Sequence, residues 1–208
     1  MLHTEAVDQS VLELISSLQS KDYLKGFYLV GDTALALYLG HRKSVDIDLF
    51  SNFGFDVSRM LENLSQDFTF HLLFSSSNTL RGSIANIKTD IIAHRYQYII
   101  EPVSMDNFFI LSEEDIIAMK LNAIITSGER AKDFIDIYFL LEKFELADMI
   151  RFYNSKYNQE NDGLILKSLI YFDDVDISDW PILIKSPGLK WSVIKKRIED
   201  VVMRYLKK

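Results

Sequence analysis

Asp46 and Asp48 are separated by one residue within the apolar segment Val45–Phe50. If this segment is a strand, its period of two residues places both carboxylates on one face and the apolar side chains on the other. Same-face carboxylates of one strand lie about 6.5–7 Å apart and repel one another in a poorly solvated site. A cation between them would relieve the repulsion, and oxygen ligands favour Mg²⁺ or Mn²⁺. An isolated pair of this kind is more often a solvated edge strand, so the metal hypothesis depends on the neighbouring residues.

Two neighbouring segments favour phosphate chemistry. The apolar segment Phe27–Val30 leads into Gly31 and then into a helical pattern, and the backbone N–H groups of such a turn can hold phosphate. Asp90 adds a third carboxylate within the apolar segment Ile87–Ile92, where an unpaired acid would be costly. Three strand carboxylates are typical of a two-metal centre for phosphoryl transfer.

Lys120 is predicted to project from an apolar helix face. Its neighbours three and four positions away are Ile116, Ile117, Ala123 and Ile124. A buried ammonium needs an anion, although a side chain that extends to the surface is an equally good interpretation. Asp133 and Asp136 lie three residues apart in the next helical segment, so one of them could pair with Lys120 or orient a nucleophile. For Asp133, a favourable interaction with the helix dipole is the simpler alternative.

The elements that would carry these residues change in type along the chain. In the first half, helices are predicted at Val11–Leu18, Thr33–Leu39 and Val57–Leu64, and strands at Phe27–Val30, Val45–Phe50, Phe68–Phe74, Leu80–Ile84 and Ile87–Ile92. From Ser112 onward the period is helical. Helices are predicted from about Ser112 to Gly128 and at Lys132–Phe144, Leu146–Tyr157, Leu164–Tyr171 and Trp191–Tyr205.

This order predicts an α/β (α+β) protein. Residues 1–110 would form a lobe with a small mixed sheet and flanking helices, and residues 111–208 a helical lobe that completes a cleft shared by the two. The site residues would lie in that cleft.

The composition narrows the class of protein. The 208 residues include no cysteine, which excludes a disulfide framework, a cysteine nucleophile and Cys-ligated metal centres. No apolar run reaches the roughly 18–20 residues of a membrane span, and the N-terminus lacks the plan of a signal peptide. We therefore expect a cytoplasmic protein with no membrane partner. Net charge is −7, but residues 185–208 hold eight basic and two acidic residues, which is compatible with phosphate contacts or with a solvated helix face.

Together these residues resemble the AbiEii/AbiGii-type nucleotidyltransferase toxins, of the DNA polymerase β-like nucleotidyltransferase superfamily. The resemblance covers about residues 25–185. It is carried by the segments Val30–Phe50, Lys88–Asp90, Ser112–Leu121, Lys132–Leu141 and Tyr171–Asp174.

The resemblance implies a role for each matching residue. Asp46 and Asp48 match the metal-binding pair and Asp90 the third metal-binding acid, while Lys120 and Asp133 match the helical catalytic residues. Gly31, Thr33, Arg42 and Ser44 match the nucleotide side of the site. Asp32 departs from the family pattern, which usually has Gly or Ser there, and places a negative charge near the expected triphosphate.

The function implied is a Mg²⁺- or Mn²⁺-dependent nucleotidyltransferase that moves NMP from an NTP to a hydroxyl acceptor. The acceptor is expected to be RNA, such as the 3′ end of tRNA, and the protein a toxin of a toxin–antitoxin or phage-defence system with a cognate antitoxin. Two alternatives stay open. One is nucleotidylation of a protein hydroxyl. The other is an NTP- or metal-binding regulatory module that has lost catalysis, an alternative that stays open because Asp32 places a negative charge near the expected triphosphate.

Overall fold

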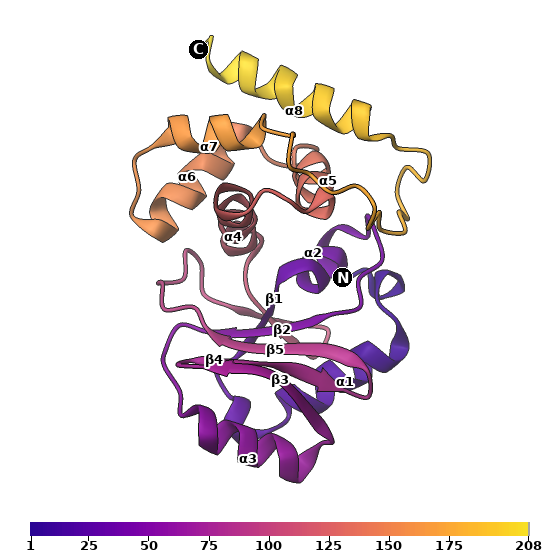
Figure 1. Ribbon diagram of the computed structural model, residues 1–208, viewed down its shortest axis with the longest axis vertical. Coiled ribbons are helices and arrows are strands. Elements are labelled where there is room, and N and C mark those ends of the chain that lie inside the picture. The colour runs from indigo at the N-terminus through magenta and orange to yellow at the C-terminus, as the bar shows by residue number, and fades with distance from the viewer. Residues whose placement is uncertain (208) are drawn as a thin grey trace. The chain divides into compact units, whose positions relative to one another are not determined.

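The computed structural model describes residues 1–207. The chain forms two compact units, one of residues Met1–Ser112 and a second that begins at Glu113 (Figure 1). Within the described residues, the first unit contains every strand and the second contains helices joined by turns and loops. The predicted α/β class, with a mixed sheet followed by a helical part, is confirmed.

The first unit is built on one mixed sheet with the strand order β3-β4-β5-β2-β1-β7-β6. Its strands are β1 (Tyr28–Val30), β2 (Ile47–Ser51), β3 (Phe70–Ser76), β4 (Thr79–Ile84), β5 (Ile87–Ala93), β6 (Val103–Met105) and β7 (Phe108–Ile110). Strand β2 pairs antiparallel with β1 and parallel with β5, so both of its edges are hydrogen-bonded. Strand β1 pairs parallel with β7 on its other side.

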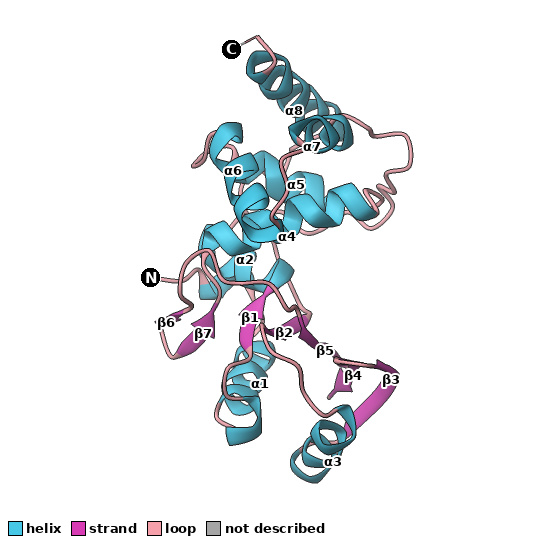
Figure 2. Cartoon of the chain, turned by 90° about the vertical axis from the view of Figure 1, so that its left-hand side faces the viewer, coloured by secondary structure: helices cyan, strands magenta, loops and turns pink. Residues whose placement is uncertain are grey.

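Three α-helices cover this sheet. They are α1 (Gln9–Gln19), α2 (Gly31–Leu39) and α3 (Val57–Asp67), and two short 3₁₀ turns lie at Thr4–Ala6 and Asp22–Leu24. Figure 2 shows α1 and α3 on one side of the sheet and α2 on the other. Helix α2 is apolar almost all round, and its residues from Ala34 to Leu37 are fully buried, so it has the composition of a core helix.

Strand β2 shows the alternation that its sequence predicts. Ile47 and Leu49 are fully buried, whereas Asp48 and Phe50 on the opposite face are half-buried. One face of the strand therefore contributes to the core, while the other presents a carboxylate and an aromatic ring.

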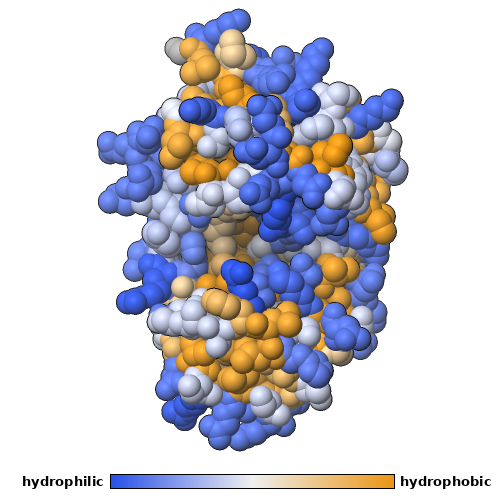
Figure 3. All heavy atoms as spheres, in the orientation of Figure 1, coloured by the Kyte–Doolittle hydropathy of each residue, from blue (hydrophilic) through white to orange (hydrophobic). Residues whose placement is uncertain are grey.

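The strand at one edge of the sheet, β3, contributes little to the core. Leu72, Leu73 and Phe74 are exposed, and β3 pairs only with β4. Figure 3 shows apolar side chains gathered over this part of the first unit. The core of the unit is instead built from the inner strands and from the helices that cover them.

The second unit contains α4 (Glu113–Thr126), α5 (Ala131–Leu140), α6 (Leu146–Tyr157), α7 (Asp162–Leu169) and α8 (Trp191–Tyr205). Helix α4 packs against α5, α6 and α7, and α8 packs across the same three helices. Among residues 1–207, no helix is long and apolar enough to cross a bilayer.

The structure differs from the predicted elements in two missed strands and in several element boundaries. Strands β6 and β7 were not predicted, because three-residue strands are too short to show a period. The helix predicted at Lys132–Phe144 ends at Leu140, after which the chain turns toward α6. Strand β2 begins at Ile47, so Asp46 lies directly before the strand and not within it.

Candidate active site

Two of the three predicted metal-binding acids are paired neighbours in the sheet. Asp48 of β2 and Asp90 of β5 are direct partners in the parallel register, so their side chains share one face of the sheet. Adjacent strands are about 4.8 Å apart, closer than same-face residues along one strand. The sheet therefore brings together two carboxylates that lie 42 positions apart in the chain.

The pKa of Asp48 is raised from its ordinary value to about 7, mainly because burial disfavours the charged form. The negative charge of Asp32 raises it further, the positive charge of Lys88 lowers it, and Asp90 and Asp46 add smaller increases. This concentration of negative charge on one face is what a bound cation would neutralise.

Gly31 makes the position of the Asp48 carboxylate possible. It lies where β1 turns into α2 and has a φ of +70°, a conformation that side chains other than glycine rarely adopt. A Cβ atom at this position would lie 2.5 Å from Asp48 Oδ2, which is too close for two non-bonded atoms. The absence of a side chain at Gly31 thus allows the carboxylate to reach the first turn of α2.

Thr33 and Ser44, expected on the nucleotide side, hold the segment that leads into β2. Both side chains are buried. The Thr33 hydroxyl hydrogen-bonds Ser44 Oγ at 2.9 Å and donates to the backbone carbonyl of Asp46. Their contacts within this unit therefore fix the backbone of Asp46 immediately before the strand that carries Asp48.

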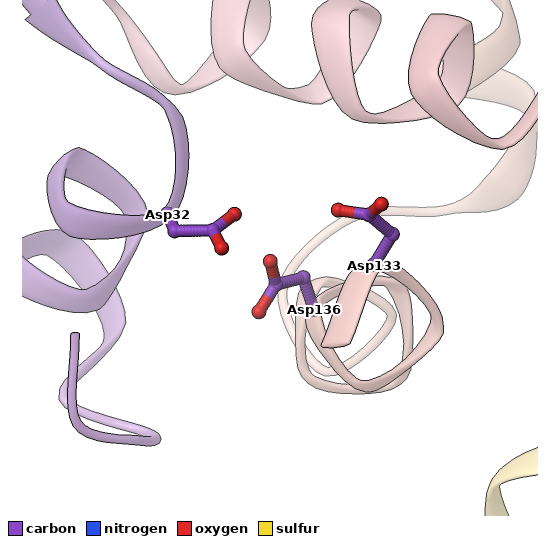
Figure 4. A group of neighbouring side chains, drawn as sticks. All are labelled: Asp32, Asp133 and Asp136. Atoms are coloured by element: carbon purple, nitrogen blue, oxygen red, sulfur yellow. The ribbon is translucent and has the colours of Figure 1, made fainter. Parts of the chain in front are cut away.

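Arg42, also expected on the nucleotide side, forms an ion pair with Asp32. Arg42 Nη2 lies 3.4 Å from Asp32 Oδ1, and both side chains are buried. Asp32 projects from the first turn of α2 (Figure 4), and the N-cap residue of this helix, Val30, makes no side-chain cap hydrogen bond. The residue that departs from the family pattern is thus matched by a buried cation ten positions further along the chain.

Two cations beside Asp90 were missed by the sequence analysis. Arg81 Nε lies 3.6 Å and Lys88 Nζ 3.4 Å from Asp90 Oδ2, and both basic side chains are about half exposed. A signal was present, because Lys88 lies two residues before Asp90 on the same face. In addition, Ile84 pairs with Ile87 across a two-residue turn, and this register places Arg81 opposite Asp90.

The two oxygens of Asp90 have different surroundings. Oδ2 faces the two cations, whereas Oδ1 is buried and has no hydrogen-bond partner within residues 1–207. A buried carboxylate oxygen without a partner is costly, and a divalent cation is one group that would satisfy it.

The second unit contains a buried cluster of charged side chains around Lys120. The Lys120 ammonium of α4 lies 2.8 Å from Asp133 Oδ1 and 2.7 Å from Asp136 Oδ2, both on α5. Figure 4 shows Asp133 and Asp136 projecting from the same helix. Arg130 Nε approaches the other oxygen of Asp133 at 3.6 Å. Lys120 therefore pairs with both acids, where the sequence suggested one.

Comparisons with known proteins agree with this architecture. Uncharacterized protein aq_aa25 of Aquifex aeolicus (strain VF5) is 33% identical over 171 residues, which make up 78% of this chain and 81% of that protein. A crystal structure described as "putative nucleotidyltransferase from H. pylori" matches with a TM-score of 0.54 over 96% of both chains, and at 16% identity it supports the fold. The family model described as "Nucleotidyl transferase AbiEii toxin, Type IV TA system" matches residues 14–200. The chain is therefore a nucleotidyltransferase and belongs to the AbiEii toxin family of type IV toxin–antitoxin systems.

Proposed function

We propose that this nucleotidyltransferase uses Mg²⁺ or Mn²⁺, held by Asp46, Asp48 and Asp90, to transfer NMP from an NTP to a hydroxyl group of RNA. The 3′ end of tRNA is the acceptor that we favour. The observation that carries the proposal is the pairing of Asp48 with Asp90 on one face of the sheet, with the pKa of Asp48 raised by burial and by neighbouring acids. The proposed cellular setting is the cytoplasm, with a cognate antitoxin and a role in phage defence.

The residues fit a divalent cation. All three proposed ligands are carboxylates, which Mg²⁺ and Mn²⁺ prefer. The buried Oδ1 of Asp90 has no hydrogen-bond partner within residues 1–207, so it is available to coordinate a cation. When bound, such a cation lowers the pKa of an attacking hydroxyl and stabilises the charge that develops on the leaving pyrophosphate.

The chain's own residues would orient the reactants. The acceptor oxygen forms a bond to the α-phosphorus as the bond to pyrophosphate breaks, and the acceptor hydroxyl loses its proton to solvent. Backbone N–H groups in the first turn of α2, beginning at Gly31, can donate to phosphate oxygens. Arg81 and Lys88 are partly exposed and can turn from Asp90 toward phosphate once a divalent cation neutralises that carboxylate.

The remaining predicted residues have positioning roles in this proposal. Thr33 and Ser44 hold the backbone at Asp46, and Arg42 holds Asp32. In the second unit, Lys120 and Asp133 form one buried network with Asp136, which fixes the direction of the Lys120 side chain.

Transfer can be tested directly with each of the four α-³²P-labelled NTPs, Mg²⁺, total RNA and a total protein extract. We expect label from at least one NTP to enter an RNA band, to require Mg²⁺ and to be removed by ribonuclease. Label that is removed by protease would identify a protein hydroxyl as the acceptor. If no NTP labels either fraction with Mg²⁺ or Mn²⁺, the regulatory-module alternative is supported and the proposed function is wrong.

A second prediction concerns helix α8, which carries much of the basic C-terminal segment. Arg197 already donates to the backbone carbonyl of Leu141, whereas Lys195 and Lys196 make no hydrogen bond or ion pair among the described contacts. The double substitution Lys195→Glu and Lys196→Glu should raise the KM for acceptor RNA several-fold. It should also reduce the salt-dependence slope of RNA binding by about 1.4, or about 0.7 for each lost phosphate contact.

The matched control for α8 is Lys25→Glu with Lys167→Glu, which changes net charge equally at exposed lysines elsewhere. We expect this control to leave the salt slope unchanged and both variants to keep the parental KM for NTP. Equal salt slopes for the α8 variant and the control would show that α8 presents a solvated face and not an RNA-binding surface.

A further inference from the structure

Aromatic side chains line the sheet immediately beside the paired carboxylates. Tyr28 of β1 and Phe50 of β2 are direct register partners. Phe50 follows Asp48, the partner of Asp90, by two residues along β2. Because side chains alternate along a strand, Phe50 lies on the same face as Asp48, about 6.5–7 Å further along. The carboxylate face therefore continues directly into an aromatic one.

The segment that follows β5 extends this aromatic surface. The ring of His94 lies 6.0 Å from Phe50 and 4.8 Å from Tyr96, measured between ring centroids. The ring of Tyr98 makes an edge contact with Tyr28 at 5.7 Å. A hydrogen bond from the His94 backbone to the carbonyl of Ser51 holds the segment beside the end of β2. We call these five rings, Tyr28, Phe50, His94, Tyr96 and Tyr98, the aromatic face.

The exposure of these rings distinguishes them from core aromatics. Each residue of the aromatic face is half-buried or exposed, and Tyr96 is 44% exposed. In contrast, Phe27, which precedes Tyr28 and points to the other side of β1, is buried. Rings that only filled the core would be covered in the same way, so the aromatic face has ring surface available for a ligand.

We propose that the aromatic face binds a nucleobase by stacking. Bases stack on aromatic side chains with little sequence preference, since every base has a π-face. A nucleotide carries its base one ribose away from both its α-phosphate and its 3′-hydroxyl. A surface that begins two residues after Asp48 on the same strand face is therefore suited to the base of a reacting nucleotide. The inference deepens the proposed function, on which it rests, by assigning where a base is held; the base can belong to the NTP or to the 3′-terminal nucleotide of the acceptor.

Two fluorescent probes separate these sources. The first is the α,β-methylene triphosphate of 2-aminopurine riboside, which represents the incoming nucleotide and cannot release pyrophosphate. The second is a short RNA with 2-aminopurine at a 3′-deoxy terminus, which represents the acceptor and cannot be extended. Stacking quenches 2-aminopurine fluorescence, so titration with the full chain in the presence of Mg²⁺ reports contact with rings without any transfer.

The variants are Tyr96→Ala, the conservative Tyr96→Phe, and Phe50→Leu, which keeps an apolar side chain but removes the ring. Phe53→Ala is the control, because Phe53 is an equally exposed aromatic residue of the same unit whose ring contacts the buried Phe27 and not the aromatic face. We expect Tyr96→Ala and Phe50→Leu to weaken binding of one probe by about 5- to 150-fold and to abolish its quenching. Tyr96→Phe and Phe53→Ala should bind that probe as the parent does.

The probe that responds identifies the base that is bound. The inference would be overturned if the parent protein quenched neither probe. It would also be overturned if Tyr96→Ala and Phe50→Leu both bound and quenched the probe as the parent does. The outcome is independent of catalysis, because neither probe can react. Quenching that depends on Tyr96 and Phe50 in a protein that transfers no nucleotide would support the aromatic face and refute the proposed function.

Discussion

The substitution Asp48→Asn is expected to reduce nucleotidyl transfer by about a thousandfold or more, because it removes a central proposed cation ligand. The asparagine side chain has nearly the same shape, so the pairing of β2 with β1 and β5 should persist. The measurement is the initial rate of label transfer at saturating NTP and Mg²⁺. Asp22→Asn, at an exposed acid of the same unit, is the control and should keep parental activity.

The same substitution, Asp48→Asn, is expected to raise the stability of the fold while it lowers activity. In the folded chain the pKa of Asp48 is raised to about 7, so the folded state binds more protons than the unfolded state between about pH 4 and 7. Stability from this group therefore falls as pH rises through that window. Asparagine does not titrate, so in EDTA at pH 8 the Tm of Asp48→Asn should exceed that of the parent, and the difference should vanish near pH 4. A parental transfer rate, or a lower Tm at pH 8, would contradict the role assigned to Asp48.

Replacing Lys120 by methionine is expected to lower the free energy of unfolding by about 3–5 kcal/mol. The substitution removes the cation that lies within 3 Å of both Asp133 and Asp136 and leaves two buried acids facing an apolar side chain. For a chain of this size the Tm should fall by roughly 6–20 °C, at about 2–4 °C for each kcal/mol. Thermal unfolding followed by circular dichroism measures the change.

The control for Lys120 is Lys143→Met, which breaks the ion pair between Lys143 and Glu113 in the same unit. The Lys143 side chain is 55% exposed, so this pair is worth about 1 kcal/mol or less. If Lys120→Met and Lys143→Met lowered Tm equally, the Lys120 cluster would contribute no more to the free energy of unfolding than a surface ion pair does.

The local features of the site could be predicted from the sequence, because each depends on a short-range period. Alternation along Val45–Phe50 predicts that Asp48 and the buried Ile47 and Leu49 lie on opposite faces, as the structure shows. Helical spacing predicts that Lys120 projects from an apolar face, and the side chain is buried.

The contacts between distant segments could not be predicted in the same way. The partner of Asp48 across the sheet depends on strand order and register, which no local period encodes. The ion pair between Asp32 and Arg42 depends on how the end of α2 turns toward β2, so the sequence alone presented Asp32 as an unexplained charge. Strands β6 and β7 were missed for a related reason, since β7 is defined by its pairing with β1 and not by its own three residues.

The strand order has a consequence for how the protein is synthesised. Asp48 can pair with Asp90 only after β5 has left the ribosome, and β1 gains its outer neighbour only when β7 follows, near residue 110. Chains fold as they emerge, and pairings between distant strands form later than local ones. For most of the first half of its translation the nascent chain thus holds the carboxylate of Asp48 on a strand that has not yet met β5, and a truncated product that ends before β5 would lack Asp90 and this pairing altogether.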